Sequence, residues 1–276
     1  MDDIASIYRE FGFMEPPFNQ TPDTNLLYMS KQHTKALNHL RYGLLTEGFT
    51  LLTGEIGLGK TILCRQLLKS TDEGIRTAYI YNTYIGLLDL LKLIYHDFTG
   101  EVIESTSYST CFNELNRFLI QMAENGEKVV VLIDEAQGLQ RDVLEGLRQL
   151  SNLETEKKKL LSIIMVGQPE ITTLLKEKSL RQLDQRISVR CVLKPLELSE
   201  TRKYVYYRMA LVTDKTSDVT VPHFSDFAMY LIHRFSRGVP RRINQICDRA
   251  LLASFNVGKV EIGAWILQRA AREVLR

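Results

Sequence analysis

The chain has 276 residues, 45% of them hydrophobic, which excludes an intrinsically disordered protein and suits one large or two modest globular domains. Lys and Arg total 35 against 33 Asp and Glu, and the formal net charge of +2 gives no overall electrostatic signature of a polyanion-binding protein. The longest apolar runs, residues 129–133 and 160–166, are strand-sized, and the first ten residues are too polar for a secretory signal. We therefore expect a soluble, intracellular protein without a membrane segment.

The cysteines and histidines show no spacing typical of a metal site or a redox dithiol. No CxxC pair and no HExxH pattern occurs, so buried reduced thiols and core or surface histidines are expected. The residues concerned are Cys64, Cys111, Cys191, Cys247, His33, His39, His96, His223 and His233.

The predicted elements begin with an irregular segment, residues 1–30, rich in proline and aromatic residues and followed by a helix that Ser30 could cap. From residue 49 onward, short apolar runs alternate with helical patterns. This alternation predicts a parallel sheet covered by helices on both faces. The five runs are residues 49–53, 77–81, 128–134, 161–167 and 187–193.

After Pro195 the strand signals stop and helical periodicity takes over. One predicted helix has a core face made of Phe224, Phe227, Ala228, Leu231, Ile232 and Phe235. A second helix follows residues 238–240, and a last one covers about 260–275. The sequence thus predicts an α/β core at residues 31–196 and a small helical domain at 197–276.

The stretch GEIGLGKT, residues 54–61, fits the phosphate-loop pattern GxxxxGK[ST] and lies between a predicted strand and a predicted helix, as the pattern requires. Lys60 is suited to bind the β- and γ-phosphates, and the Thr61 hydroxyl to bind Mg²⁺. An incidental glycine-rich turn is the alternative interpretation. Backbone N–H groups can curl around phosphate oxygens because of the freedom supplied by Gly54, Gly57 and Gly59.

Two further strand ends carry polar groups. In VVVLIDEAQ, residues 129–137, Asp134 is placed to hold Mg²⁺ and Glu135 to polarise the attacking water, although a core strand can also simply end in an acidic loop. Gln168 follows another strand and is expected at the carboxyl edge of the sheet, where ligands of open α/β folds bind. It would orient the water or contact the γ-phosphate, or alternatively cap the helix that starts near Pro169.

Arginines at two places are candidates for contacts to a transferring phosphoryl group. Arg186, beside Arg181 and Arg190 near the last strand, could reach a neighbouring subunit's nucleotide, and a solvated or salt-bridged arginine is the alternative for each. In GVPRRIN, residues 238–244, Gly238 and Pro240 predict the end of one helix and the start of the next. Arg241 then begins a helix from which it could reach the γ-phosphate, whereas Arg242 points about 100° away.

These motifs together resemble those of an AAA+ ATPase, and within that superfamily the chain is similar to the ExeA/GspA group of type II secretion and related pilus machinery. The resemblance covers nearly the whole chain. It implies an α/β P-loop fold with a five-stranded parallel sheet, a C-terminal helical lid and an N-terminal flap whose Phe18 to Tyr28 part packs beside the adenine. The supporting stretches are residues 11–37, GEIGLGKT, LIDEAQ, GQPE, LRQLDQRI and GVPRRINQICDRALL.

The resemblance also implies ATP and Mg²⁺ as ligands and a role for each motif. Gln168 would be sensor 1, Arg186 the arginine finger and Arg241 sensor 2, with Glu135 and Lys60 completing the catalytic set. Thr61 and Asp134 would hold the metal. The nucleotide contacts would come from Gly54, Glu55, Gly57, Leu58, Gly59, Lys60, Thr61, Ile62, Asp134 and Arg241.

The first functional hypothesis is an ATPase that forms a homo-oligomer, such as a ring, and drives or regulates assembly of an envelope secretion or pilus machine. It would act in the cytoplasm or at the inner face of the inner membrane. Members of the group usually continue into a membrane helix and a periplasmic peptidoglycan-binding domain. The chain would thus be either a cytoplasmic fragment or a short relative resembling MshM.

Two alternatives remain open. A DNA-dependent ATPase resembling TnsC would bind duplex DNA through a local basic patch, such as residues 176–186 or the cluster from Arg237 to Arg242. A nucleotide-binding adaptor with negligible hydrolysis is the other alternative, and the presence of Glu135 argues against it.

Overall fold

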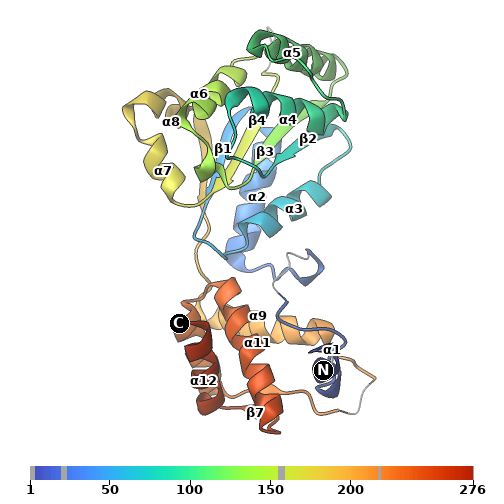
Figure 1. Cartoon of the computed structure of the whole chain (residues 1–276), viewed down its shortest axis with the longest axis vertical. Helices are drawn as coiled ribbons and strands as arrows, with labels where there is room; N and C mark the ends of the chain where they lie inside the picture. Colours follow the sequence, from blue (N-terminus) through green and yellow to red (C-terminus); the bar gives the residue numbers. More distant parts are fainter. Residues whose placement is uncertain (1–3, 20–23, 155–158, 217–218, 276) are drawn as a thin grey trace. The chain divides into compact units, whose positions relative to one another are not determined.

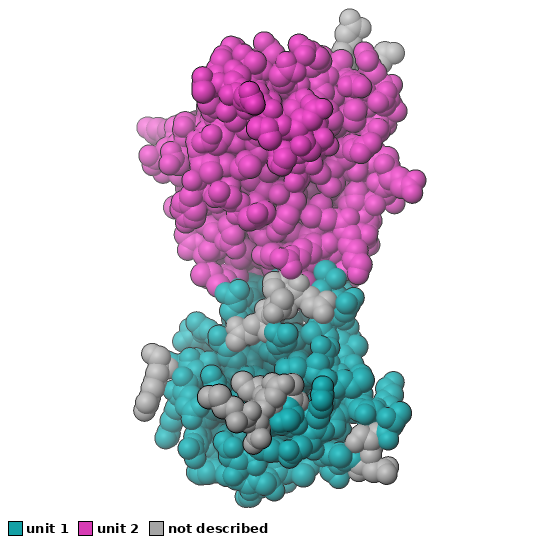
Figure 2. All heavy atoms as spheres, turned by 45° about the vertical axis from the view of Figure 1, so that its right-hand side comes forward, with its two compact units in different colours: residues 1–32, 57–59, 194–276 teal, residues 33–56, 60–193 magenta. Residues whose placement is uncertain are grey.

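The computed structural model describes residues 4–19, 24–154, 159–216 and 219–275, whose contacts form two compact units (Figure 2). The α/β unit comprises residues 33–56 and 60–193, and the helical unit comprises residues 1–32, 57–59 and 194–276. The domain boundaries at 30/31 and 196/197 stay a prediction.

The α/β unit is built on a parallel five-stranded sheet with the strand order β2-β3-β4-β1-β5 (Figure 1). All five predicted strands are confirmed. Every residue of the central strands β1 and β4 is buried, because helices cover both faces of the sheet. The strands are β1 Gly48–Thr53, β2 Ile75–Ile80, β3 Lys128–Ile133, β4 Ser162–Gly167 and β5 Ile187–Val192.

Helices pack on both faces of this sheet. Alternate side chains of β3, Val129, Val131 and Ile133, join one core with apolar residues of α4, α5 and α6. On the opposite face α2 approaches closely, since a Cβ at Gly43 would lie 2.4 Å from Thr50 Oγ1. The helices are α2 Lys31–Leu45, α3 Lys60–Lys69, α4 Leu87–Thr99, α5 Tyr108–Glu124, α6 Arg141–Leu150, α7 Glu170–Leu175 and α8 Arg181–Arg186, with the 3-10 turns η2 Ala136–Gly138 and η3 Lys178–Leu180.

The helical unit contains the predicted helices and further elements that were not predicted, among them a helix in the N-terminal segment that was expected to be irregular. Strands β6 His223–Phe224 and β7 Glu261–Ile262 form a parallel pair, and two residues each are too few to show periodicity. The last helix consequently begins at Ala264 rather than near residue 260. The predicted core face of α10 was partly wrong, because Phe227 is 58% exposed and Met229 is buried instead. The helices are α9 Leu198–Val212, α10 Asp226–Ser236, α11 Pro240–Asn256 and α12 Ala264–Val274.

The N-terminal segment packs on this helical unit through α1 Ile4–Glu10, the 3-10 turn η1 Thr24–Leu26 and the aromatic residues around them. The rings of Phe18 and Phe224 lie 6.5 Å apart, and Tyr28 contacts the rings of Tyr204 and Tyr207. Residues 20–23 of the expected adenine-side segment lie outside the described residues, so a place beside the adenine stays a prediction.

A buried arginine fastens the same segment. Arg208 is 5% exposed, and its guanidinium donates to the carbonyl oxygens of Pro17 at 2.8 Å and Asn19 at 3.0 Å. It also donates to the Tyr204 hydroxyl, which in turn donates to Asn244 Oδ1.

In the part of the chain that the structure describes, no helix is both long and apolar enough to cross a membrane.

The turn before α11 requires glycine. Gly238 has φ +73°, and a Cβ there would lie 2.0 Å from the Leu196 carbonyl oxygen. We expect Gly238→Ala to lower the free energy of unfolding by roughly 2–5 kcal/mol, the sum of left-handed strain and overpacking. Gly258→Ala is the matched control, because Gly258 has φ +62° in open space and should cost only about 1–2 kcal/mol. Equal losses in urea unfolding would contradict the steric argument.

Candidate nucleotide-binding site

Three neighbouring strands place the candidate groups at one edge of the sheet. Strand β4 pairs with β1 and β3, with Thr53 opposite Gly167 and Ile133 opposite Met165. The Gly54 amide donates to the Gly167 carbonyl oxygen at 3.2 Å. The phosphate loop, the Asp134–Glu135 pair and Gln168 therefore all follow adjacent carboxyl ends, which is where the sequence placed them.

Within the phosphate loop, Lys60 is the first residue of α3 and is only 5% exposed. Its Nζ donates to the carbonyl oxygens of Gly54 at 2.7 Å and Glu55 at 3.2 Å, so the loop curls around the ammonium group. Gly57 and Gly59 adopt φ +83° and +95°, a conformation that favours glycine. Of the other predicted contacts, Glu55 is exposed, Leu58 is buried, and Thr61 and Ile62 are half-buried.

The surroundings of the Lys60 ammonium lower its pKa. Burial lowers the pKa of Lys60, and the nearby Glu135 and Asp134 carboxylates act in the opposite direction. The loop thus holds a cation close to two acids inside the fold. Such a cation is stabilised further when phosphate oxygens approach it.

Asp134 directly follows β3 and is 2% exposed. Its Oδ1 accepts the Glu135 amide at 2.9 Å and its Oδ2 accepts the Tyr79 hydroxyl at 3.1 Å. Burial and this carboxylate both raise the pKa of Tyr79, so the tyrosine stays a neutral donor. Tyr79 is a site residue that the sequence did not reveal, because β2 shows only an apolar strand pattern.

Glu135 has a left-handed backbone, φ 53° and ψ 38°, and its carbonyl oxygen accepts the Thr83 hydroxyl at 3.0 Å. Its Oε2 accepts Gln137 Nε2 at 2.5 Å and Gln168 Nε2 at 3.3 Å. The fold thus brings Glu135 and Gln168 together. The Gln168 side chain donates to Glu135, while its backbone carbonyl oxygen accepts the Ile171 amide at 3.2 Å at the start of α7.

Gln137 was missed by the sequence reasoning. Its Oε1 accepts the Gln168 amide at 2.9 Å, so this side chain joins the turn after β3 to the end of β4. The DEAQ stretch contains the residue, yet no spacing rule distinguishes it from any other polar side chain in a turn.

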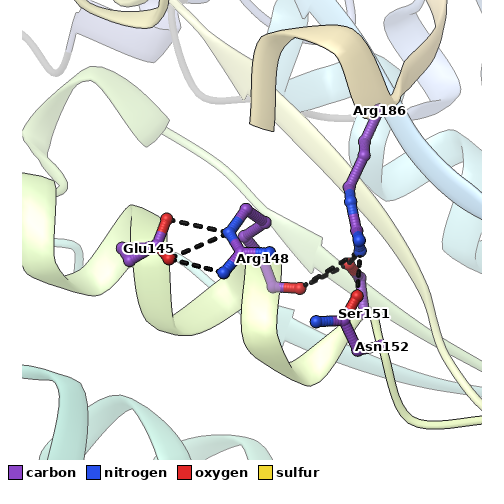
Figure 3. Close-up of polar contacts among 5 residues, drawn as sticks. All are labelled: Glu145, Arg148, Ser151, Asn152 and Arg186. Carbon is purple, nitrogen blue, oxygen red and sulfur yellow. Dashed lines mark hydrogen bonds and ion pairs between the residues drawn. The ribbon is translucent and has the colours of Figure 1, made fainter. Parts of the chain in front are cut away.

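The candidate finger Arg186 is the last residue of α8, and its side chain reaches the C-terminal end of α6 (Figure 3). Its Nη1 donates to Ser151 Oγ at 3.0 Å, to Asn152 Oδ1 and to the Arg148 carbonyl oxygen at 3.5 Å, while Arg148 itself pairs with Glu145. Among the described residues, Arg186 makes no hydrogen bond to the phosphate loop or the carboxylates of its own chain. The role of Arg186 as a finger stays a prediction.

The two neighbouring arginines differ from Arg186. Arg190 forms an ion pair with Asp184 at 2.8 Å, which matches the salt-bridged alternative. Arg181 is exposed, and no hydrogen bond or ion pair joins it to another described residue.

Arg241 is exposed near the start of α11, where Pro240 is the first residue as predicted. Its amide donates to the carbonyl oxygen of Gly57, a residue that groups with the helical unit, at 3.2 Å. A Cβ at Gly57 would lie 2.7 Å from Arg241 Cβ. Arg242 is also exposed, and of the two it is Arg241 that adjoins the loop.

The residues present suit Mg²⁺. The Asp134 carboxylate and the Thr61 hydroxyl are hard oxygen ligands, and Mg²⁺ usually combines one or two such groups with water and phosphate oxygens. No cluster of three or more His, Cys, Asp or Glu that could hold a metal occurs among the described residues. The donor set therefore fits an ion that arrives with a nucleotide.

The comparisons with known proteins agree with this geometry. Residues 44–175 match the family model described as an AAA domain. The chain is 42% identical over 265 residues to General secretion pathway protein A of Aeromonas hydrophila, an alignment that covers 96% of this chain and 48% of that protein. The chain contains an AAA domain and is homologous to general secretion pathway protein A. It spans about half the length of that relative.

Solved structures show the same fold at low identity. Cdc6p of Pyrobaculum aerophilum has a TM-score of 0.68 at 18% identity, covering 94% of this chain and 70% of its own. Drosophila ORC bound to DNA has a TM-score of 0.66 at 16% identity, covering 98% and 65%. The RuvB Holliday junction branch migration motor of Thermotoga maritima has a TM-score of 0.52 at 18% identity, covering 88% and 69%. These likenesses concern the fold alone.

The lowered pKa of Lys60 predicts a pH dependence of stability. Because the folded value lies below the ordinary 10.5, the unfolded chain binds more protons in the window between them, and stability rises with pH there. Relative to Lys60→Met, which lacks the titrating group, the unmodified chain should gain stability as the pH rises from about 7 to 10. Urea unfolding of both proteins across this range measures the difference, and a constant difference would contradict the shift.

Proposed function

We propose that the chain hydrolyses ATP as a nucleotide-dependent homo-oligomer and thereby drives or regulates assembly of a type II secretion or related pilus machine. The observation that carries the ATPase part is the position of the Lys60 ammonium inside the phosphate loop, with Asp134 and Glu135 at the adjoining strand end. The homology to general secretion pathway protein A supports the secretion part, and the partners and activity of that longer protein are a proposal for this chain.

Each residue has a definite task in this proposal. Lys60 binds the β- and γ-phosphates, and Thr61 and Asp134 hold the ion; bound Mg²⁺ supplies charge neutralisation on the phosphates. Glu135 accepts a proton from the attacking water, and Gln168, bonded to the same carboxylate, orients that water. Arg241 acts as the sensor of the γ-phosphate, a role supported by its position beside Gly57.

Glu135→Gln tests the hydrolytic step. The substitution keeps the shape of the side chain but removes the base, so we expect ATP binding to persist and kcat to fall about 100-fold or more. Equilibrium binding of a fluorescent ATP analogue and a phosphate-release assay measure the two quantities. Unchanged turnover would remove Glu135 from its role, and no turnover in the unmodified chain would refute the ATPase proposal.

The oligomeric site predicts complementation between inactive subunits. Arg186→Ala can bind ATP but offers no finger, whereas Lys60→Ala offers a finger but cannot hold the phosphates. We expect each to lose about 10³-fold in kcat and a mixture to regain part of the activity. Arg190→Ala is the matched control, since Arg190 is paired with Asp184, and it should stay active. A mixture no more active than its components contradicts a finger supplied in trans.

The DNA-dependent alternative stays a prediction. It would be favoured if duplex DNA stimulated phosphate release and raising the salt concentration abolished the effect, because phosphate contacts are salt-dependent. No contact in the structure favours it over the secretion proposal.

A further inference from the structure

Gln137 makes two contacts that the chemistry described above does not explain. Its Nε2 donates to Glu135 Oε2 at 2.5 Å, and its Oε1 accepts the Gln168 backbone N–H at 2.9 Å. A single amide group therefore connects the carboxylate after β3 to the backbone at the end of β4. Glutamine is suited to this span because one end of its amide donates and the other accepts.

The Glu135 main chain is restrained more tightly than its carboxylate. Its carbonyl oxygen accepts the Thr83 hydroxyl at 3.0 Å and the Gly138 amide at 2.9 Å, and these bonds hold a left-handed backbone that is uncommon for glutamate. Neither bond fixes the carboxylate, whose orientation depends on its own side-chain torsions. Amide donors must therefore set the direction of the carboxylate.

Both amide donors act on the same carboxylate oxygen. Gln137 at 2.5 Å and Gln168 at 3.3 Å donate to Glu135 Oε2. Within the described part of the chain, no group donates to Oε1. Oε1 can therefore accept a proton without breaking either of these bonds.

Gly167 leaves room for the contact between Gln137 and the end of β4. A Cβ at Gly167 would lie 2.9 Å from Gln137 Oε1 and 3.3 Å from the Gln137 backbone nitrogen. The end of β4 therefore lacks a side chain at the place where Gln137 approaches. The side-chain amide of Gln137 therefore packs directly against Gly167.

We propose that Gln137 is a positioning residue for ATP hydrolysis: it holds Glu135 through Oε2 so that Oε1 faces the attacking water, and it links that orientation to Gln168. The proposal rests on the proposed function, with Glu135 as the base. In the step concerned, the water oxygen bonds to the γ-phosphorus while the water proton passes to Oε1. The bond from the γ-phosphorus to the β–γ bridging oxygen breaks, and its electron pair stays on ADP.

The first test separates turnover from binding in the full chain. Gln137→Met keeps a similar length but has no amide, so we expect kcat to fall about 10- to 100-fold while affinity for a fluorescent non-hydrolysable ATP analogue changes less than about threefold. Gln140→Glu is the matched control in the same turn, because Gln140 is exposed and makes no capping bond, and it should behave as the unmodified chain. Unchanged kcat in Gln137→Met, or loss of nucleotide binding, overturns the proposal.

The second test asks whether the amide donor, rather than the size of the side chain, is what matters. Gln137→Glu keeps the length of glutamine but replaces the amide NH2 with a carboxylate oxygen, which cannot donate to Glu135 Oε2. We therefore expect the kcat of Gln137→Glu to fall at least as far as that of Gln137→Met. A Gln137→Glu protein with the kcat of the unmodified chain overturns the proposal.

Glu135→Gln in the same assay separates the two proposals. If Glu135→Gln is inactive and both Gln137 variants are fully active, only the positioning role fails. If Glu135→Gln hydrolyses ATP normally, the base assignment fails, and the positioning role fails with it.

Discussion

Parallel pairing of β4 with β1 on one side and β3 on the other sets the positions of the phosphate loop, the Asp134–Glu135 pair and Gln168. Parallel strands present their carboxyl ends at one edge, and residues far apart in the sequence meet there. The Gly54–Gly167 hydrogen bond extends the pairing by one residue into the phosphate loop. The sheet thus determines where the phosphate loop begins, and the glycines of the loop determine only how its backbone turns.

The same edge carries structural costs. Lys60 is a buried ammonium without a direct ion pair to any described residue, and Glu135 adopts a backbone conformation that costs about 1–3 kcal/mol for such a residue. The loop carbonyl oxygens, Thr83 and the amides of Gln137 and Gln168 offset these costs. A ligand with several negative oxygens would offset the cost of burying the Lys60 ammonium. The folded chain is therefore suited to a polyphosphate rather than optimised for stability.

The sequence predicted those parts of the molecule that repeat a pattern over many residues. Five apolar strands and the phosphate loop were recognisable because periodicity and glycine spacing are local properties. The pair β6–β7 was not, since two residues show no period, and Phe227 was misplaced because α10 buries Met229 instead. The bridge made by Gln137 depends on β3 and β4 lying side by side, and a single sequence does not display contacts between distant strands.

Charge pairing distinguishes Arg186 from three nearby arginines, Arg141, Arg148 and Arg190. Arg148 pairs with Glu145, Arg141 with Glu177 and Arg190 with Asp184, each within 2.8 Å. The acceptors of Arg186 are a hydroxyl, an amide and a carbonyl oxygen, so its position is fixed while its charge has no ion-pair partner among the described residues (Figure 3). Moving it to a phosphate would break hydrogen bonds to neutral acceptors and no ion pair to a described residue. If Arg186 is the proposed finger, its charge is therefore available to a phosphate, which the charge of a salt-bridged arginine is not.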